Sequence, residues 1–147
     1  MNQKELTHSL RKEAILKGHS VKTIASGYSM FPFLRKGDLL TVEPVSIDSV
    51  KRGDIVVSEL NETWIAHRVI KIASTHGRTE LTTRGDARMS IDPRVVKENY
   101  IGVVSYLERD KKNISLISLR KKTSTQIHLL GGKLLSFLLN YLARKKH

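Results

Sequence analysis

A serine, a histidine and two carboxylates follow one another along this chain in an order that could support nucleophilic chemistry. Ser29 lies in the segment SGYSMFP at 26–32, and His67 lies in the middle of an apolar run with strand character. Asp86 and Asp92 lie six positions apart in a glycine-hinged loop, so both could point at one place. A serine hydroxyl needs a base to take its proton, and an imidazole base needs an acceptor on its other nitrogen. Taken singly, the same residues are also explained as a loop serine, a core histidine and turn carboxylates.

The elements that must position these residues are predicted to be short strands between two helices. A helical pattern covers residues 2–18, where apolar residues recur about every four positions and a glycine follows. Runs rich in β-branched residues, separated by Gly-Asp pairs and proline, predict strands at 21–25, 39–45, 55–60, 63–73, 80–85 and 100–107. We therefore predict a mainly β fold of bent antiparallel sheets, with one N-terminal helix and one C-terminal amphipathic helix.

The positive charge of the chain is concentrated near its C-terminus. The 147 residues carry 26 Lys and Arg against 14 Asp and Glu, a net charge of +12, and the segment 108–147 holds ten of the basic residues but only two of the acidic ones. We therefore predict a globular body at 1–107, which includes the N-terminal helix, and a basic tail at 108–147. The absence of cysteine excludes disulfides, thiolate metal sites and cysteine nucleophiles. The charged N-terminal segment lacks the apolar run of a signal peptide, so we expect the chain to begin in the cytosol.

Five motifs follow one another between residues 21 and 105. They are Ser-Gly-x-Ser-Met-x-Pro, a Gly-Asp turn, Gly-Asp-Ile-Val-Val, His-Arg-Val and a Gly-Asp loop that ends in aspartate. In this order they resemble the type I signal peptidase superfamily, which is related to the self-cleaving phage-repressor peptidases. Bacterial members commonly have Lys-Arg where this chain has His67-Arg68. With histidine at this position the chain resembles the archaeal and endoplasmic-reticulum branch, in which serine acts with histidine and a downstream aspartate.

The resemblance implies a serine endopeptidase in which Ser29 is the nucleophile and His67 is the general base. Asp92 is the expected acceptor that orients the imidazole, and Asp86 either shares that role or holds the loop in place. The backbone N–H of Ser29 is the expected donor to the oxyanion. Lys71, the alternative base for a serine–lysine dyad, lies about 13 Å from His67 along an extended strand. We expect the other histidines to face solvent, and we expect neither a cofactor nor a metal ion.

The expected substrate is a peptide or precursor protein cut after small residues, as the resemblance implies. Residues 127–146 predict a helix with a wide apolar face and basic ends, which could bind an anionic membrane surface on the cytoplasmic side or dock on the body or on a second copy. The alternatives are a maturation protease for a non-secretory precursor and a basic nucleic-acid-binding protein. We expect no nucleic acid partner, because the basic residues of the tail flank an apolar helix without interleaved aromatic residues.

Overall fold

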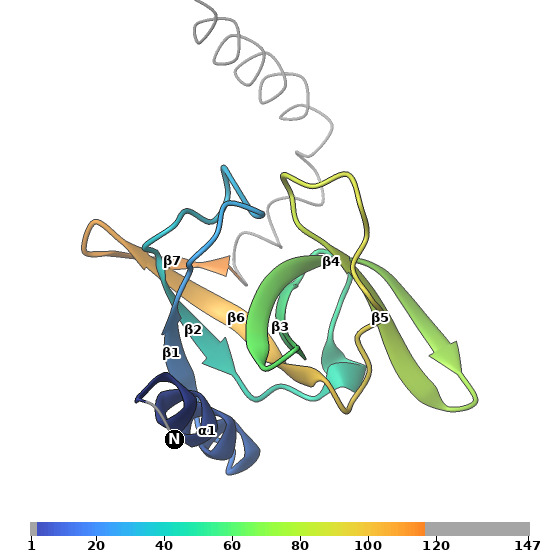
Figure 1. The fold of residues 1–147 in the computed structure, drawn as a ribbon. Coiled ribbons are helices and arrows are strands. Elements are labelled where there is room, and N and C mark those ends of the chain that lie inside the picture. The colour runs from blue at the N-terminus through green and yellow to red at the C-terminus, as the bar shows by residue number, and fades with distance from the viewer. Residues whose placement is uncertain (1–2, 117–147) are drawn as a thin grey trace, which may run out of the picture. The chain divides into compact units, whose positions relative to one another are not determined.

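Short runs rich in β-branched residues form the strands of this protein, since such side chains favour a pleated backbone and pack well on neighbouring strands. The computed structural model describes residues 3–116, which fold into one helix followed by seven strands (Figure 1). A short 3-10 helix, η1 Ile47–Ser49, lies between the second and third strands. The other elements are α1 Gln3–Leu16, β1 Val21–Ile24, β2 Leu39–Glu43, β3 Ile55–Leu60, β4 Thr63–Thr75, β5 Arg78–Arg84, β6 Tyr100–Arg109 and β7 Lys112–Ser115.

All strand pairs are antiparallel, in the order β1-β2-β6-β3-β4-β5, with β7 also paired to β6. Val103 of β6 pairs with β2 on one side and with β3 on the other, so β6 is central to the sheet. The sheet is strongly curved, and the long strand β4 bends through much of its length (Figure 1). A bulge between Val69 and Lys71 interrupts the pairing of β4 with β5, which increases the local twist and bend.

The core forms where apolar side chains from β3, β4, β5 and β6 meet those of the segments between the strands. Val56, Val69, Leu81, Val95 and Val103 are almost fully buried and pack in one cluster. Two hydrogen bonds join Leu81 of β5 to Val95, one in each direction, at 2.8 and 2.9 Å. This bridge returns the chain to the edge of β5 after a loop at 85–93, so both ends of that loop are held by the core.

The mainly β, antiparallel fold predicted from the sequence is confirmed, and so is the N-terminal helix. Each of the six predicted strands is present, with ends that differ by at most two residues, and the strand at 55–60 has the predicted bounds. Strand β7 was not predicted. With the end of β6 it forms a hairpin that extends the sheet beyond residue 107, where we expected the body to end. The predicted C-terminal helix at 127–146 lies outside the described residues. Within the described part of the chain, no helix has the length and apolar character that a membrane span requires.

Candidate active site

Ser29 is carried by a loop of residues 26–37 between β1 and β2, called here the Ser29 loop. The loop is closed at its base, where the N–H of Gly37 donates to the carbonyl of Ala25 at 2.8 Å. Met30, directly after the serine, is only 3% exposed and anchors the loop in the interior. Ser29 itself is half-buried. A buried neighbour thus fixes the position of a serine that is still open to solvent.

His67 links this serine to a carboxylate. It lies in β4 opposite Val56 of β3 and is 3% exposed. Its Nε2 is 2.8 Å from Ser29 Oγ, and its Nδ1 is 2.6 Å from Asp92 Oδ2. An ionised carboxylate has only acceptors, so Nδ1 carries the proton and Nε2 is left to accept from the serine hydroxyl. Ser29, His67 and Asp92, which lie far apart in the sequence, therefore form one continuous hydrogen-bonded chain.

Asp92 is held in place by Thr83, which the sequence analysis did not single out. Thr83 is a buried residue of β5, 1% exposed, and its Oγ1 donates to Asp92 Oδ2 at 2.7 Å. The N–H of Asp92 donates to the carbonyl of Thr83 at 3.0 Å. One carboxylate oxygen thus accepts from both Thr83 and His67. A hydroxyl two residues before the Gly-Asp pair is the sequence signal that could have identified this partner.

Gly85 lies against both Ser29 and His67. A Cβ added at this position would lie 2.5 Å from the carbonyl oxygen of Ser29 and 3.1 Å from His67 Nε2. The same close approach lets the N–H of Ala87 donate to the Ser29 carbonyl at 2.8 Å. Residues 85–93, called here the Asp92 loop, therefore touch the Ser29 loop directly. Glycine is needed at position 85 because only a residue without a side chain leaves room for this contact.

Asp86 does not contact His67 and is paired with Arg68 instead. Arg68 Nε and Nη2 donate to the two oxygens of Asp86 at 2.8 and 2.7 Å, a bidentate pair. Arg68 Nη1 also donates to the carbonyl of Gly53 at 3.0 Å, and its guanidinium lies 4.6 Å from the centre of the Phe33 ring. Of the two roles open to Asp86, these contacts correspond to holding the loop. Arg68 joins the Ser29 loop, the Asp92 loop and the turn before β3.

The backbone around Ser29 leaves a donor for a developing oxyanion. Within residues 3–116, the N–H of Ser29 donates to no protein acceptor, so it is available to a substrate oxygen. Gly27 occupies the position two residues before the serine and has no hydroxyl to add, and Ser26 is exposed. Lys71, the alternative base, has an exposed side chain on the far side of the bulge in β4.

The other described histidines lie outside this arrangement. His19 and His76 are exposed, as expected. The expectation was wrong for His8, which is half-buried because its ring packs edge-to-face on Trp64 at 5.6 Å and lies 3.5 Å from Glu59. His67 differs from all of these in having a hydrogen-bond partner on each ring nitrogen.

Comparison with known proteins does not assign this chain to a family. No family model matches the chain, and no curated protein matches it significantly.

Proposed function

We propose that this protein is a serine endopeptidase in which Ser29 is the nucleophile, His67 the general base and Asp92 the residue that orients the imidazole. The observation that carries the proposal is the pair of short contacts made by one buried imidazole, to Ser29 Oγ on one side and to Asp92 Oδ2 on the other. A serine hydroxyl becomes an effective nucleophile when a base accepts its proton during the attack. The carboxylate stabilises the imidazolium that this transfer creates.

The proposed reaction proceeds through an acyl-enzyme. Ser29 Oγ forms a bond to the scissile carbonyl carbon while its proton passes to His67 Nε2, and the carbonyl oxygen gains the negative charge that the N–H of Ser29 stabilises. His67 then gives the proton to the departing amine as the C–N bond breaks. A water molecule attacks the acyl group and gives a proton to the same nitrogen. That proton returns to Ser29 Oγ when the free carboxyl product leaves.

The substrate class follows from the resemblance to signal peptidases. We propose that the chain belongs with the histidine-containing branch of that superfamily and cuts a precursor or leader peptide after small residues. The acyl-transfer chemistry does not depend on this assignment, because it needs only the three hydrogen-bonded side chains and an oxyanion donor. A maturation protease acting on a non-secretory precursor would use the same residues.

The proposal is tested by removing the nucleophile and leaving its surroundings intact. In cells carrying Ser29→Ala, we expect uncut precursors to accumulate and the corresponding new N-termini to disappear from a proteome-wide survey. In vitro, a fluorophosphonate should modify wild-type protein at Ser29 and leave Ser29→Ala and His67→Ala unlabelled. Ser26→Ala is the matched control, because this serine lies in the same loop with an exposed side chain. Retained peptide cleavage by purified Ser29→Ala would disprove the mechanism.

A lysine at position 67 tests the alternative dyad chemistry. A lysine must lose its proton to act as a base, and a carboxylate beside it favours the ammonium form. Because Asp92 Oδ2 faces this position, we expect His67→Lys to give little or no cleavage. Substantial rescue would mean that the site can operate as a serine–lysine dyad.

We also propose that residues 127–146 bind an anionic membrane surface. The support is the sequence pattern alone, an apolar face with basic ends. Truncation after Gln126 should abolish binding to vesicles that contain an anionic phospholipid and should leave cleavage of a short soluble peptide unchanged. If the truncated protein loses its thermal transition, the segment belongs to the core or to an interface between copies.

A further inference from the structure

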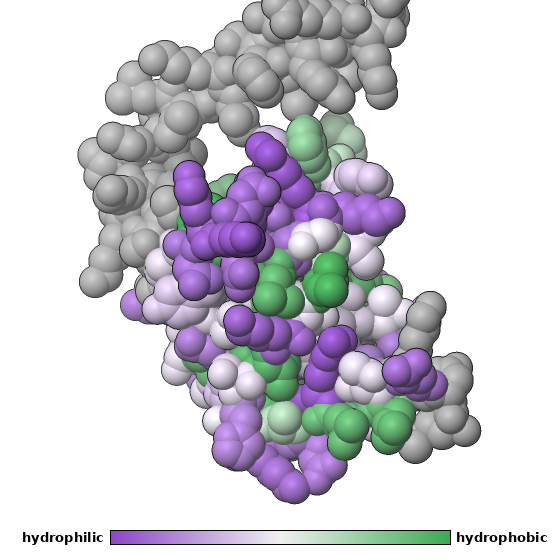
Figure 2. Space-filling model, turned by 90° about the vertical axis from the view of Figure 1, so that its left-hand side faces the viewer, coloured by the Kyte–Doolittle hydropathy of each residue, from purple (hydrophilic) through white to green (hydrophobic). Residues whose placement is uncertain are grey.

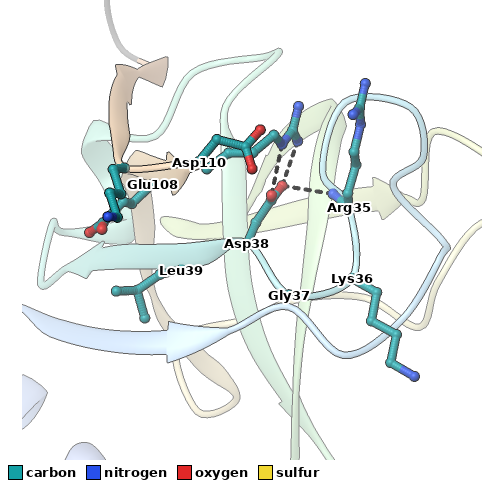
Figure 3. A pocket seen from close by; sticks show the side chains of 9 residues that line it. Arg35, Lys36, Gly37, Asp38, Leu39, Glu108 and Asp110 are labelled. Carbon is teal, nitrogen blue, oxygen red and sulfur yellow. Dashed lines mark hydrogen bonds and ion pairs between the residues drawn. The ribbon is translucent and has the colours of Figure 1, made fainter.

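A buried ion pair lies at the end of the Ser29 loop, away from His67. Asp38, the first residue after the loop, is only 3% exposed. Its carboxylate accepts from Arg109 Nε at 2.8 Å and from Arg109 Nη2 at 2.5 Å. It also accepts from the backbone N–H of Arg35 at 2.7 Å. These bonds lie at an open groove of about 440 Å³ lined by residues 35–39 and 108–111 (Figure 3).

The same guanidinium also reaches the middle of the loop. Arg109 Nη2 donates to the carbonyl of Phe33 at 3.0 Å, in addition to its two bonds to Asp38. Arg109 is the last residue of β6 and pairs with Lys112 of β7, so its backbone belongs to the sheet. Bidentate pairing fixes the direction as well as the distance of the contact. One residue of the sheet therefore holds both the end and the middle of the loop that carries Ser29.

A short series of contacts connects Phe33 to Ser29. The ring of Phe33 lies beneath Arg68, which is paired with Asp86 in the Asp92 loop. One residue further on, the N–H of Ala87 donates to the carbonyl of Ser29. Within the Ser29 loop, Leu34 donates to the carbonyl of Met30 at 3.0 Å and buries its side chain. A shift of the loop at Phe33 would therefore reach the serine by both routes.

A second ion pair, Lys22 with Glu108, lies close to this one in the sequence and the sheet. The face of the molecule that contains α1 and β1 is largely hydrophilic, with apolar side chains in separate groups (Figure 2). Lys22 of β1 lies 3.7 Å from Glu108, and their side chains are 61% and 38% exposed. Exposed pairs of this kind are weak and do not fix geometry, whereas the Asp38–Arg109 pair is bidentate and its carboxylate is only 3% exposed.

We propose that Arg109 is a positioning residue for the reaction assigned above, and that it holds the Ser29 loop so that Ser29 Oγ stays within hydrogen-bond reach of His67 Nε2. This inference rests on the proposed function. Arg109 touches neither the serine nor the histidine and acts through Asp38 and Phe33. Its loss should slow the chemical step, since misplacement of a nucleophile by about 1 Å can cost about 100-fold in rate.

The test compares variants that keep the protein folded. Arg109→Lys retains the charge beside Asp38 but lacks the planar fork that makes three bonds at once. The double variant Asp38→Asn with Arg109→Gln removes both charges together and leaves no unpaired buried carboxylate. Lys22→Gln is the control, because it removes a cation from a neighbouring exposed pair. For each protein, kcat, KM and the rate of fluorophosphonate labelling of Ser29 are measured well below the midpoint of thermal unfolding.

We expect Arg109→Lys and the double variant to lose about 10- to 100-fold in kcat and in labelling rate, with KM changed far less. Unchanged kcat and labelling in both folded variants, with only a lowered melting temperature, would overturn the positioning role. Absence of Ser29-dependent labelling in the wild-type protein would overturn the proposed function and this inference with it. Lys22→Gln should behave as wild type, and a loss as large as that of Arg109→Lys would mean that charge in this region, rather than the held loop, governs the rate.

Discussion

Replacing Gly85 with alanine is the smallest change that should separate Ser29, the proposed nucleophile, from His67, its proposed base. The added methyl group would lie 2.5 Å from the carbonyl oxygen of Ser29 and 3.1 Å from both Ser29 Cβ and His67 Nε2. Carbon and carbonyl oxygen ordinarily approach to about 3.3 Å, so one side of the contact must move by about 0.8 Å. The atom in the way is backbone, which cannot turn aside as the end of a flexible side chain can.

That displacement has consequences that can be estimated separately for rate and for stability. Moving the Ser29 carbonyl would strain its 2.8 Å hydrogen bond from Ala87 and would shift Oγ relative to His67. Misplacement of this size in an active site costs about 100-fold in kcat. Overpacking by one methyl group in a well-packed region costs about 1–3 kcal/mol in the free energy of unfolding. We therefore expect Gly85→Ala to remain folded and to lose about 99% of its turnover.

Gly27→Ala is the matched control for this experiment. Gly27 lies two residues before the serine, and no heavy atom would lie within 4 Å of a Cβ added there. Neither Gly27 nor Gly85 has a left-handed φ, so backbone strain does not distinguish the two substitutions. The assay is the initial rate of peptide cleavage, compared with the midpoint of thermal unfolding for each protein. Full activity in Gly85→Ala, or an equal loss in Gly27→Ala, would refute the steric argument.

Three further predictions concern the carboxylates. Asp92→Asn should reduce kcat by about 10⁴-fold, as the corresponding exchange does in serine proteases, because an amide in place of the acceptor favours the wrong imidazole tautomer; steady-state kinetics would check this. Asp86→Asn should lower the free energy of unfolding by about 1 kcal/mol through loss of the bidentate pair with Arg68, with a rate loss of about tenfold or less. Denaturant titration and the activity assay would check this, and a large rate loss in Asp86→Asn with a mainly structural loss in Asp92→Asn would mean that the two roles are reversed. Burial alone would raise the pKa of Asp38, but the hydrogen bonds from Arg109 and from the backbone of Arg35, together with their positive charges, outweigh it and hold that pKa below its usual 3.8. Because the pKa is lower in the folded state, the pair stabilises the fold above about pH 4, and this stabilisation is lost as the pH falls through the folded value. Asp38→Asn should therefore show a flatter loss of stability on acidification than the wild type, and equal acid titration curves would contradict this.

The strands were predictable because their signals are local. Runs such as IVVSEL at 55–60 are rich in β-branched residues whose preference for extended backbone needs no distant partner. Strand β7 had no such signal, since KNIS at 112–115 is polar and adjoins a basic tail. It forms because Asp110 and Lys111 both take positive φ, 51° and 62°, in the tight turn that brings it beside β6. Lysine is an unusual residue for that conformation, so the turn could not be read from the sequence.

The amino-acid sequence by itself determined the types and the order of the candidate site residues: a serine in a glycine-containing loop, a histidine within a strand, and two aspartates after a glycine. Only the tertiary structure decided which aspartate faces the imidazole, because a separation of six residues in a loop is compatible with either. The bridge between Leu81 and Val95 folds the loop back on β5, which places Asp92 beside Thr83 and leaves Asp86 to Arg68. The close approach of Gly85 and the hold of Arg109 on the Ser29 loop were likewise decided in three dimensions, since each joins segments that are distant in the chain.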